Sequence, residues 1–203
     1  MKIKTPLFIV FEGIDGAGKS TQAKLLYSFC QDKASVALLQ EPTDSHYGKT
    51  LRKMLKGEIP GTRDELLELF IQDREYDVNH NIMPLLNKGY VVIVDRYFYS
   101  TAAYQAGDGI KPLDIVRMNI EKGFPIPERV YFIDIEPSVA FERIHKRSGE
   151  NKEIFETVHA LETIRKNYLS IVDSTFAMIQ GNYTVEDIFK EVLQDFKNHF
   201  VIG

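Results

Sequence analysis

A glycine-rich segment near the N-terminus has the residue types and spacing of a phosphate-binding loop. Residues 13–20 read Gly-Ile-Asp-Gly-Ala-Gly-Lys-Ser and match the pattern G-x-x-x-x-G-K-[ST] at every fixed position. The glycines let backbone N–H groups turn toward phosphate oxygens, and the helix expected after the loop adds its positive N-terminus. Lys19 is expected to reach the β- and γ-phosphates of a nucleotide, and the Ser20 hydroxyl is expected to ligate Mg²⁺.

An acidic residue ends the most apolar stretch of the chain. Residues 90–94 are Tyr-Val-Val-Ile-Val, and Asp95 follows them. Many buried strands end in Asp, which can cap the next element, so this pattern alone is weak. With the phosphate loop upstream, we expect Asp95 to hold Mg²⁺, directly or through water, beside the phosphates of ATP.

These motifs must be positioned by the elements around them, and the chain alternates between apolar runs and helical patterns. Buried strands are expected at 7–11, 36–39, 90–95, 130–133 and 177–179. Helices are expected at about 20–33, 65–86, from 137 through 143, and after the capping pattern Thr184-x-x-Asp187. Such alternation predicts an α/β protein with a parallel sheet covered by helices on both faces. Ligands of such sheets bind at the carboxyl ends of the strands, where both motifs lie.

The composition of the chain excludes several classes of protein. The 203 residues fit one domain, and a formal net charge of −4 provides no general attraction to nucleic acid or to an anionic membrane. Cys30 is the only cysteine, which rules out an internal disulfide, and its apolar helical surroundings predict a buried structural thiol. The apolar stretch before Glu12 is too short for a signal peptide or a membrane span. We therefore expect a cytoplasmic protein without nucleic-acid or membrane partners.

The same phosphate loop occurs in GTPases, motor ATPases and kinases of small molecules. A GTPase would carry Asn-Lys-x-Asp, but the two Asn-Lys pairs, which begin at positions 87 and 151, continue differently. A motor ATPase usually has Glu beside the acid of the second motif, whereas Arg96 stands there. A kinase needs cations around its acceptor phosphate and a lid that excludes water. Arginines at 52, 74 and 96 and a basic cluster over 143–152 could serve, although each alone is more typical of a solvated surface.

Several separated motifs, in the same order, resemble thymidylate kinase, a member of the nucleoside-monophosphate kinase group. Residues 11–22, Phe-Glu-Gly-Ile-Asp-Gly-Ala-Gly-Lys-Ser-Thr-Gln, are similar to the P-loop of that family. Asp95-Arg96-Tyr97, followed by Ser100, is similar to its Asp-Arg-[Tyr/His]-x-x-Ser signature. The resemblance extends from Phe8 to about Phe196.

This resemblance implies an architecture. The expected fold is the three-layer α/β fold of P-loop kinases, with a five-stranded parallel sheet flanked by helices, in a single domain over 1–203. The acceptor-binding segment is expected at about 43–105 and a small mobile lid at about 143–156. The family also forms homodimers, so a homodimer is expected.

The resemblance further implies roles for individual residues. Phe70 would stack on thymine, and Arg74, one helical turn later, would donate to its O4, where cytosine has an amino group instead. Without the resemblance, Phe70 would be taken as ordinary core. Tyr104 would crowd the sugar 2′ position, and a packed helix residue stays open as the alternative interpretation of Tyr104. The implied substrate-binding residues are Asp15, Arg52, Phe70, Arg74, Arg96, Ser100, Thr101 and Tyr104, and the implied ATP-binding residues are Gly13, Ile14, Asp15, Gly16, Ala17, Gly18, Lys19, Ser20 and Thr21.

Three positions depart from the family pattern. Gly16 stands where some members carry a basic residue, so the resemblance is to members that supply a catalytic cation from the lid. Lys152 stands where Arg is more usual, which leaves open which lid residue meets the transferring phosphate, with Arg147 or Arg143 favoured. Gln180 stands where Asp is frequent, which leaves donor-base selectivity open. The implied catalytic residues are Lys19, Arg96, Arg143, Arg147 and Asp15, with Ser20 and Asp95 at the metal.

The expected reaction is transfer of the γ-phosphoryl group of ATP to dTMP, giving dTDP and ADP for dTTP biosynthesis. Catalysis would come from positioning and charge neutralisation, because the acceptor phosphate oxygen is already an anion. Two alternatives stay open. One is a kinase of another nucleoside monophosphate or of a deoxynucleoside, for which Glu12 could be read as a general base. The other is a regulatory P-loop ATPase with little turnover.

Overall fold

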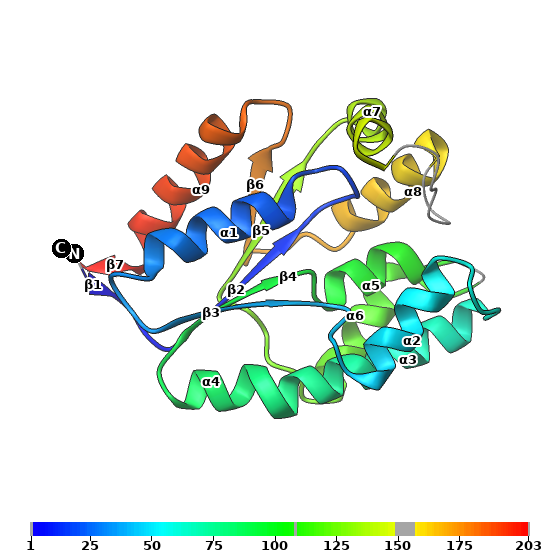
Figure 1. The fold of residues 1–203 in the computed structure, drawn as a ribbon, viewed down its shortest axis with the longest axis horizontal. Coiled ribbons are helices and arrows are strands. Elements are labelled where there is room, and N and C mark those ends of the chain that lie inside the picture. Colours follow the sequence, from blue (N-terminus) through cyan, green and yellow to red (C-terminus); the bar gives the residue numbers. More distant parts are fainter. Residues whose placement is uncertain (1, 108, 149–156, 203) are drawn as a thin grey trace.

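Five parallel strands form the central sheet of the computed structural model, which describes residues 2–107, 109–148 and 157–202. The strands lie in the order β3-β4-β2-β5-β6 (Figure 1). The two central strands β2 and β4 are buried at every position, whereas the edge strand β3 is half-buried. The predicted five-stranded parallel sheet is therefore confirmed. The strands are β2 (Leu7–Glu12), β3 (Val36–Gln40), β4 (Val91–Asp95), β5 (Arg129–Asp134) and β6 (Phe176–Gln180).

Helices flank this sheet on both faces (Figure 1). The helices α1 and α9 pack together on one face, and α4, α5 and α8 cover the other, with α3 and α6 packed against α5. A two-stranded antiparallel sheet, β1 (Lys2–Ile3) with β7 (Val201–Ile202), joins the two ends of the described chain. The helices are α1 (Lys19–Cys30), α2 (His46–Leu55), α3 (Arg63–Asp77), α4 (Met83–Asn87), α5 (Phe98–Gln105), α6 (Pro112–Glu121), α7 (Pro137–Ser148), α8 (Val158–Leu169) and α9 (Val185–Phe200).

The long helix expected at 65–86 is present but is not uniform. It begins with a complete capping box between Thr62 and Glu65, then passes through a π-helical turn, η1 (Val78–Ile82), into α4. Pro84 has no N–H to continue the α-helical ladder, and the N–H of Met83 bonds five residues back, to Val78 O. The sequence pattern did not indicate this turn.

Other boundaries differ modestly from expectation. The first helix ends at Cys30 rather than near residue 33, and α7 continues to Ser148 rather than stopping at residue 143. The last helix begins as expected, with the Thr184 side chain accepting from the N–H of Asp187. Cys30 is buried as predicted, and burial raises the pKa of its thiol to about 12.

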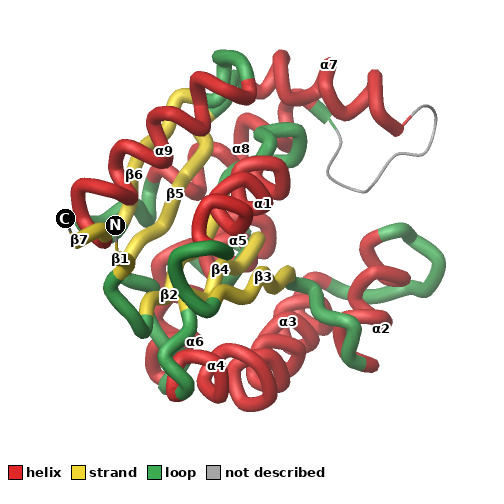
Figure 2. Tube along the Cα trace, turned by 60° about the vertical axis from the view of Figure 1, so that its left-hand side comes forward, coloured by secondary structure: helices red, strands yellow, loops and turns green. Residues whose placement is uncertain are grey.

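The strand order creates the place where ligands bind. The chain leaves β2 through α1 toward β3 on one side of the sheet, and it leaves β4 toward β5 on the other side of β2. The loops after β2 and β4 therefore diverge around an open end of the sheet. Phe11 is paired with Asp95 in the parallel ladder, which sets the two sequence motifs next to each other. Figure 2 shows α2 and α7 at this same end of the molecule. Within the described residues, none of the helices combines the length and apolar character needed to cross a membrane.

Candidate active site

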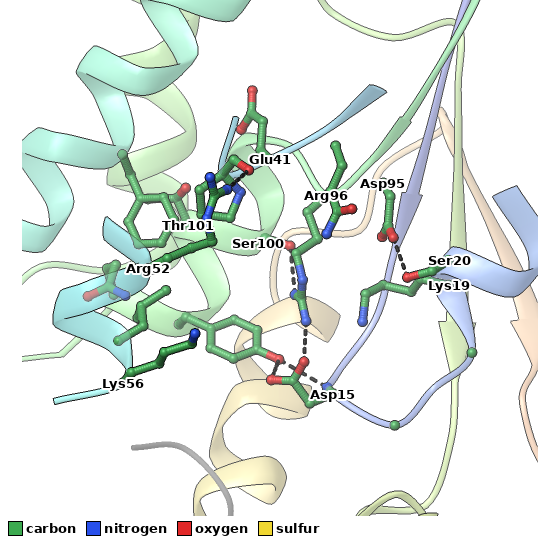
Figure 3. Close-up of a pocket in the computed structure, with 18 of the residues that line it drawn as sticks. Asp15, Lys19, Ser20, Glu41, Arg52, Lys56, Asp95, Arg96, Ser100 and Thr101 are labelled. Carbon is green, nitrogen blue, oxygen red and sulfur yellow. Dashed lines mark hydrogen bonds and ion pairs between the residues drawn. The ribbon is translucent and has the colours of Figure 1, made fainter. Parts of the chain in front are cut away.

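A cavity of about 490 Å³ opens at the carboxyl ends of β2 and β4 (Figure 3). The P-loop forms one side of this cavity, and residues from α2, α3 and α5 form the other. Its walls are lined by Asp15, Gly16, Gly18, Lys19, Ser20, Thr21, Gln40, Glu41, Pro42, Arg52, Leu55, Lys56, Phe70, Asp95, Arg96, Ser100, Thr101, Tyr104, Gln105 and Arg143.

The P-loop is held by close backbone approaches that only glycine permits. Gly13 has φ +145°, and a Cβ there would lie 2.6 Å from the carbonyl oxygen of Ile133 on β5. Gly16 has φ +79°, and a Cβ there would lie 2.5 Å from the carbonyl oxygen of Ala140 on α7. The loop is thus wedged between the central sheet and α7, which leaves its inner surface free to surround an anion.

Lys19 curls over this loop instead of extending into solvent. Its Nζ donates a 2.9 Å hydrogen bond to the carbonyl oxygen of Ile14, and the side chain is 5 % exposed. Burial lowers the pKa of Lys19 to about 8, with a further lowering from the charge of Arg96. Of the residues predicted to bind ATP, Gly13, Ile14 and Ala17 lie behind the cavity wall and the other six line it.

Ser20 and Asp95 meet at the floor of the cavity. The Ser20 Oγ donates a hydrogen bond to Asp95 Oδ2, while Asp95 Oδ1 is buried and has no hydrogen-bond partner among the described residues. Hydroxyl and carboxylate oxygens are the donors that Mg²⁺ prefers, and an unpartnered buried carboxylate oxygen leaves capacity for one more ligand bond. This pair fits the predicted magnesium site. The described residues contain no group of three or more His, Cys, Asp or Glu side chains that could hold a metal ion.

Arg96, Asp15 and Tyr104 form a second polar group above the P-loop. Arg96 Nη2 donates to Asp15 Oδ1 (Figure 3). The Tyr104 hydroxyl donates to Asp15 Oδ2 at 2.8 Å. The guanidinium of Arg96 also lies over the Tyr104 ring, 5.1 Å from its centroid. Burial and the neighbouring Asp15 raise the pKa of Tyr104, so the hydroxyl stays protonated as a donor. These contacts hold the guanidinium of Arg96, which directly follows β4, at the cavity wall.

Further cations come from α2. Arg52 donates from Nη1 to the carbonyl oxygen of Pro42 and from Nη2 to Asp44 Oδ1, both at 2.8 Å. Lys56 lies one helical turn later and also lines the cavity (Figure 3). The spacing of Arg52 and Lys56 predicts a shared helix face, so this signal was present in the sequence although Lys56 was not among the predicted residues.

The far end of the cavity is less polar and contains Phe70. Arg74, expected to share that pocket, is 1 % exposed and lies one layer behind the cavity wall. Its Nε and Nη2 donate to Glu41 Oε2 at 3.1 and 2.6 Å, its Nη1 to Asn119 Oδ1 at 2.8 Å, and its Nη2 to Thr101 Oγ1 at 3.0 Å. Four of its five N–H donors are used by these bonds, which leaves one on Nη1.

Comparison with known proteins agrees with this arrangement. The family model described as thymidylate kinase matches residues 11–192. The chain belongs to the thymidylate kinase family. The thymidylate kinase of Leptospira borgpetersenii serovar Hardjo-bovis (strain L550) is 43 % identical over 201 residues, which is 98 % of each chain. A probable thymidylate kinase of Archaeoglobus fulgidus is 38 % identical over 187 residues, which is 92 % of each chain.

A solved thymidylate kinase structure from Candida albicans has the same fold. It superposes with a TM-score of 0.78 at 22 % identity, covering 98 % of this chain and 96 % of that one. This thymidylate kinase family member therefore has the predicted P-loop kinase architecture, in which β2, β4 and their following loops carry the site.

The lid predicted for this thymidylate kinase family member is only partly described. Arg143 on α7 lines the cavity and donates from Nη2 to the carbonyl oxygen of Gly181 at 3.1 Å, beside the loop that follows β6. Residues 149–156, which include Lys152, and the side chain of Arg147 lie outside the described part of the chain.

Two buried polar residues of the lining were also missed by sequence reasoning. Glu41 is 3 % exposed and reaches the cavity from the end of β3, and Gln105 ends α5 with a buried Nε2 that has no hydrogen-bond partner among the described residues. Neither belongs to a motif with recognisable spacing. Their placement follows from where β3 ends and where α5 packs, and both depend on contacts distant in sequence.

Proposed function

We propose that the protein transfers the γ-phosphoryl group of ATP to dTMP, giving dTDP and ADP. The observation that carries the proposal is that the P-loop, Arg96 and Arg52 border a single cavity. A phosphoryl transfer between two nucleotides needs an anion cradle for the donor and separate cations for the acceptor phosphate. The family and its curated relatives support dTMP kinase activity, and the two alternatives are not favoured.

The proposed chemistry rests on charge neutralisation. Lys19 and the P-loop N–H groups would hold the β- and γ-phosphates of ATP, while Arg96 and Arg52 would hold the acceptor phosphate. Asp15 would contact the sugar 3′-hydroxyl and keep the Arg96 guanidinium in place through their ion pair. The attacking oxygen is an anion already, so no side chain has to remove a proton. Arg143 and Arg147 are the proposed lid cations.

The proposed metal is Mg²⁺, held by Ser20 and Asp95. When bound with ATP, the ion would neutralise charge on the β- and γ-phosphate oxygens. Support comes from the unpartnered buried oxygen of Asp95 and from the adjacent Ser20 hydroxyl. Both side chains line the same cavity as Lys19.

The proposed acceptor base lies against Phe70. Stacking on an aromatic ring is favourable for any base, so selection must come from polar atoms at the base edge. We assign that role to Ser100, Thr101 and the remaining N–H of Arg74, which is held behind Thr101. Tyr104 would crowd the sugar 2′ position from α5, because its ring is fixed between Asp15 and Arg96.

The alternative of a deoxynucleoside kinase has a specific difficulty. Such an enzyme needs a general base for the sugar hydroxyl, and Glu12 was the candidate. Glu12 is fully buried and does not line the cavity, and its two oxygens accept from Tyr97, Ser100 and Tyr168. Arg52 and Arg96 at the acceptor end would also have no acceptor phosphate to bind if the acceptor were a nucleoside.

We also propose a cytoplasmic homodimer. Exposed apolar side chains on α3, α4, α6 and the loop after α6 support a shared interface, since these helices lie on one side of the sheet (Figure 1). Light scattering after size-exclusion chromatography tests this, and a mass near 23.3 kDa, that of one chain, would overturn it. The exposed residues are Tyr76, Met83, Leu113, Ile120 and Ile126.

The function is tested by measuring ADP release with ATP and Mg²⁺ in the presence of different acceptors. Strong dependence on dTMP, with dCMP and thymidine almost inactive, is the expected result. Comparison of dUMP with UMP tests the role of Tyr104 at the sugar. Slow ADP release that is equal with every acceptor, or with none, would replace the proposal with a regulatory ATPase.

A further inference from the structure

Glu12 lies directly before the P-loop, and the proposed reaction gives it no part. It ends β2 and has no exposed surface. Its Oε1 accepts from the backbone N–H groups of Tyr97 (2.8 Å) and Ser100 (3.2 Å). Its Oε2 accepts from Ser100 Oγ (2.5 Å) and from the Tyr168 hydroxyl (2.9 Å). A carboxylate with four donors is held in one position by all of them.

Three of these four donors belong to the start of α5. Tyr97 is the N-cap residue of this helix, and its side chain makes no capping hydrogen bond. Glu12 supplies the missing acceptor from the end of β2, and its negative charge is favoured at the positive end of the helix. Glu12 therefore fixes where α5 begins, and with it the positions of Thr101 and Tyr104.

Arg96 immediately precedes this capped start and has a strained backbone. Its φ is +71°, the only positive φ of a non-glycine residue in the described part of the chain. Such a conformation is unfavourable for a residue with a Cβ and persists when the surroundings determine it. The N–H of Arg96 donates to Phe11 O at 3.0 Å, and the next N–H, that of Tyr97, donates to Glu12. Two consecutive residues of β2 thus hold the turn that aims Arg96.

The hydroxyl of Ser100 connects this cap to the Arg96 guanidinium. Because its single proton is directed at Glu12, its lone pairs are free to accept, and Arg96 Nη1 donates to Ser100 Oγ at 3.2 Å. The hydroxyl of Tyr168, on α8, is the fourth donor to Glu12, and its oxygen lies 2.8 Å from Ser100 Oγ. Tyr168 is fully buried, and its ring packs on Phe132 with centroids 5.0 Å apart.

We infer that Glu12 and Tyr168 are positioning residues that hold Arg96 in its acceptor-binding conformation, so that α8 helps to organise the acceptor phosphate site. The inference rests on the proposed function, in which Arg96 binds the acceptor phosphate. Neither side chain lines the cavity. Loss of the Tyr168 hydroxyl would leave the buried Glu12 short of a donor and would loosen the turn that carries Arg96.

The test is the Tyr168→Phe variant, compared with wild type for dTMP and for thymidine. Thymidine has the same base and sugar but no phosphate, so its inhibition constant reports on the rest of the pocket. We expect KM for dTMP to rise about tenfold, as for a lost hydrogen bond to a charged group, while the thymidine inhibition constant and KM for ATP change less than about twofold. The Glu12→Gln variant, which places an amide among the same donors, is expected to act in the same direction.

A matched control is the Tyr131→Phe variant. Tyr131 is also a buried tyrosine whose hydroxyl donates to a carboxylate, Asp195, at 3.0 Å, and it does not line the cavity. It is expected to leave both dTMP and thymidine constants unchanged. Equal losses for dTMP and thymidine in Tyr168→Phe would overturn the inference and make Tyr168 a packing residue. A wild-type protein without dTMP-dependent turnover would instead overturn the proposed function.

Discussion

The hydroxyl of Ser20 donates a hydrogen bond to Asp95 Oδ2, although the two residues are 75 positions apart in the chain. Ser20 lies in the first turn of α1, and Asp95 ends β4. The parallel pairing of β2 with β4 brings the end of β4 beside the P-loop. The pair therefore places two oxygen donors of the type that Mg²⁺ binds at the mouth of the phosphate cradle.

This relationship predicts a specific metal dependence. Asp95→Asn keeps the shape of the side chain and removes its charge, so turnover is expected to fall roughly a hundredfold or more at saturating Mg²⁺. A Mg²⁺ titration of ADP release measures it. Asp134→Asn is the matched control, because Asp134 also ends a strand but is bound to Arg165, away from the cavity. An Asp95→Asn protein with wild-type Mg²⁺ dependence would remove Asp95 from the proposed metal site.

Lys19 is the proposed donor-phosphate cation. Lys19→Ala is expected to reduce turnover by roughly a thousandfold, because the charge on the γ-phosphate would develop without its neutralising partner. The melting temperature is expected to stay near that of wild type, since burial already disfavours the charged amine, as its lowered pKa of about 8 indicates. Lys24→Ala, on the exposed side of α1, should keep full activity. Normal turnover in Lys19→Ala would contradict the assignment of residues 13–20 as a phosphate-binding loop.

The stability of the protein is expected to depend on pH because of Asp77, the last residue of α3. Burial raises the pKa of Asp77 from 3.8 to about 6, and the negative charge of Asp73 adds to the rise. A hydrogen bond from the Asn81 side chain and the positive charge of Arg74 oppose it. The folded protein therefore binds more protons than the unfolded chain between these values, and the contribution of Asp77 to stability is lost as pH rises through about 6.

The Asp77→Asn variant should remove that loss. The free energy of unfolding of the variant minus that of wild type is expected to increase by on the order of 2 kcal/mol from pH 4 to pH 6.5. Urea unfolding at both pH values measures this difference. Asp64→Asn, at the exposed start of the same helix, serves as the control. If the difference between Asp77→Asn and wild type is the same at both pH values, Asp77 does not titrate in this window.

The parts of the site that sequence predicted are those fixed by local patterns. A strand followed by a P-loop must place Lys19 and Ser20 at the helix N-terminus, and an acid ending a neighbouring parallel strand must lie beside them. Arg96 follows directly from Asp95. The P-loop residues and Asp95 were therefore readable from spacing, whereas the acceptor-phosphate role of Arg96 was implied by the family resemblance. Lys56 was not predicted, although its spacing to Arg52 carried the signal.

The parts that sequence did not predict depend on distant partners. Spacing placed Arg74 and Phe70 on one helix face, but it could not show that Glu41, 33 residues away, would hold the guanidinium behind the cavity wall. The bond between Glu12 and Tyr168 spans 156 residues and follows only from how α8 packs on α5. The π turn after α3 was missed because the apolar pattern continues through it.

The buried pair of Arg74 and Glu41 leads to a prediction that separates folding from base recognition. Glu41 Oε2 accepts two bonds from Arg74; burial raises the pKa of Glu41, and the charge of Arg74 opposes that rise and favours the carboxylate. Arg74→Ala is expected to destabilise the protein by about 3–5 kcal/mol, because it breaks a buried pair. It should also lower the preference for dTMP over dCMP, by roughly tenfold or more, because the donor toward thymine O4 is lost.

The double variant Arg74→Ala, Glu41→Gln distinguishes the two effects. Replacing the carboxylate removes the buried group that Arg74 neutralised, so part of the lost stability is expected to return in urea unfolding. The ratio of kcat/KM for dTMP to that for dCMP should stay low, since no N–H donor has been restored. If the double variant regains thymine preference together with stability, the base edge is read by other residues, and Arg74 serves only to pair with Glu41.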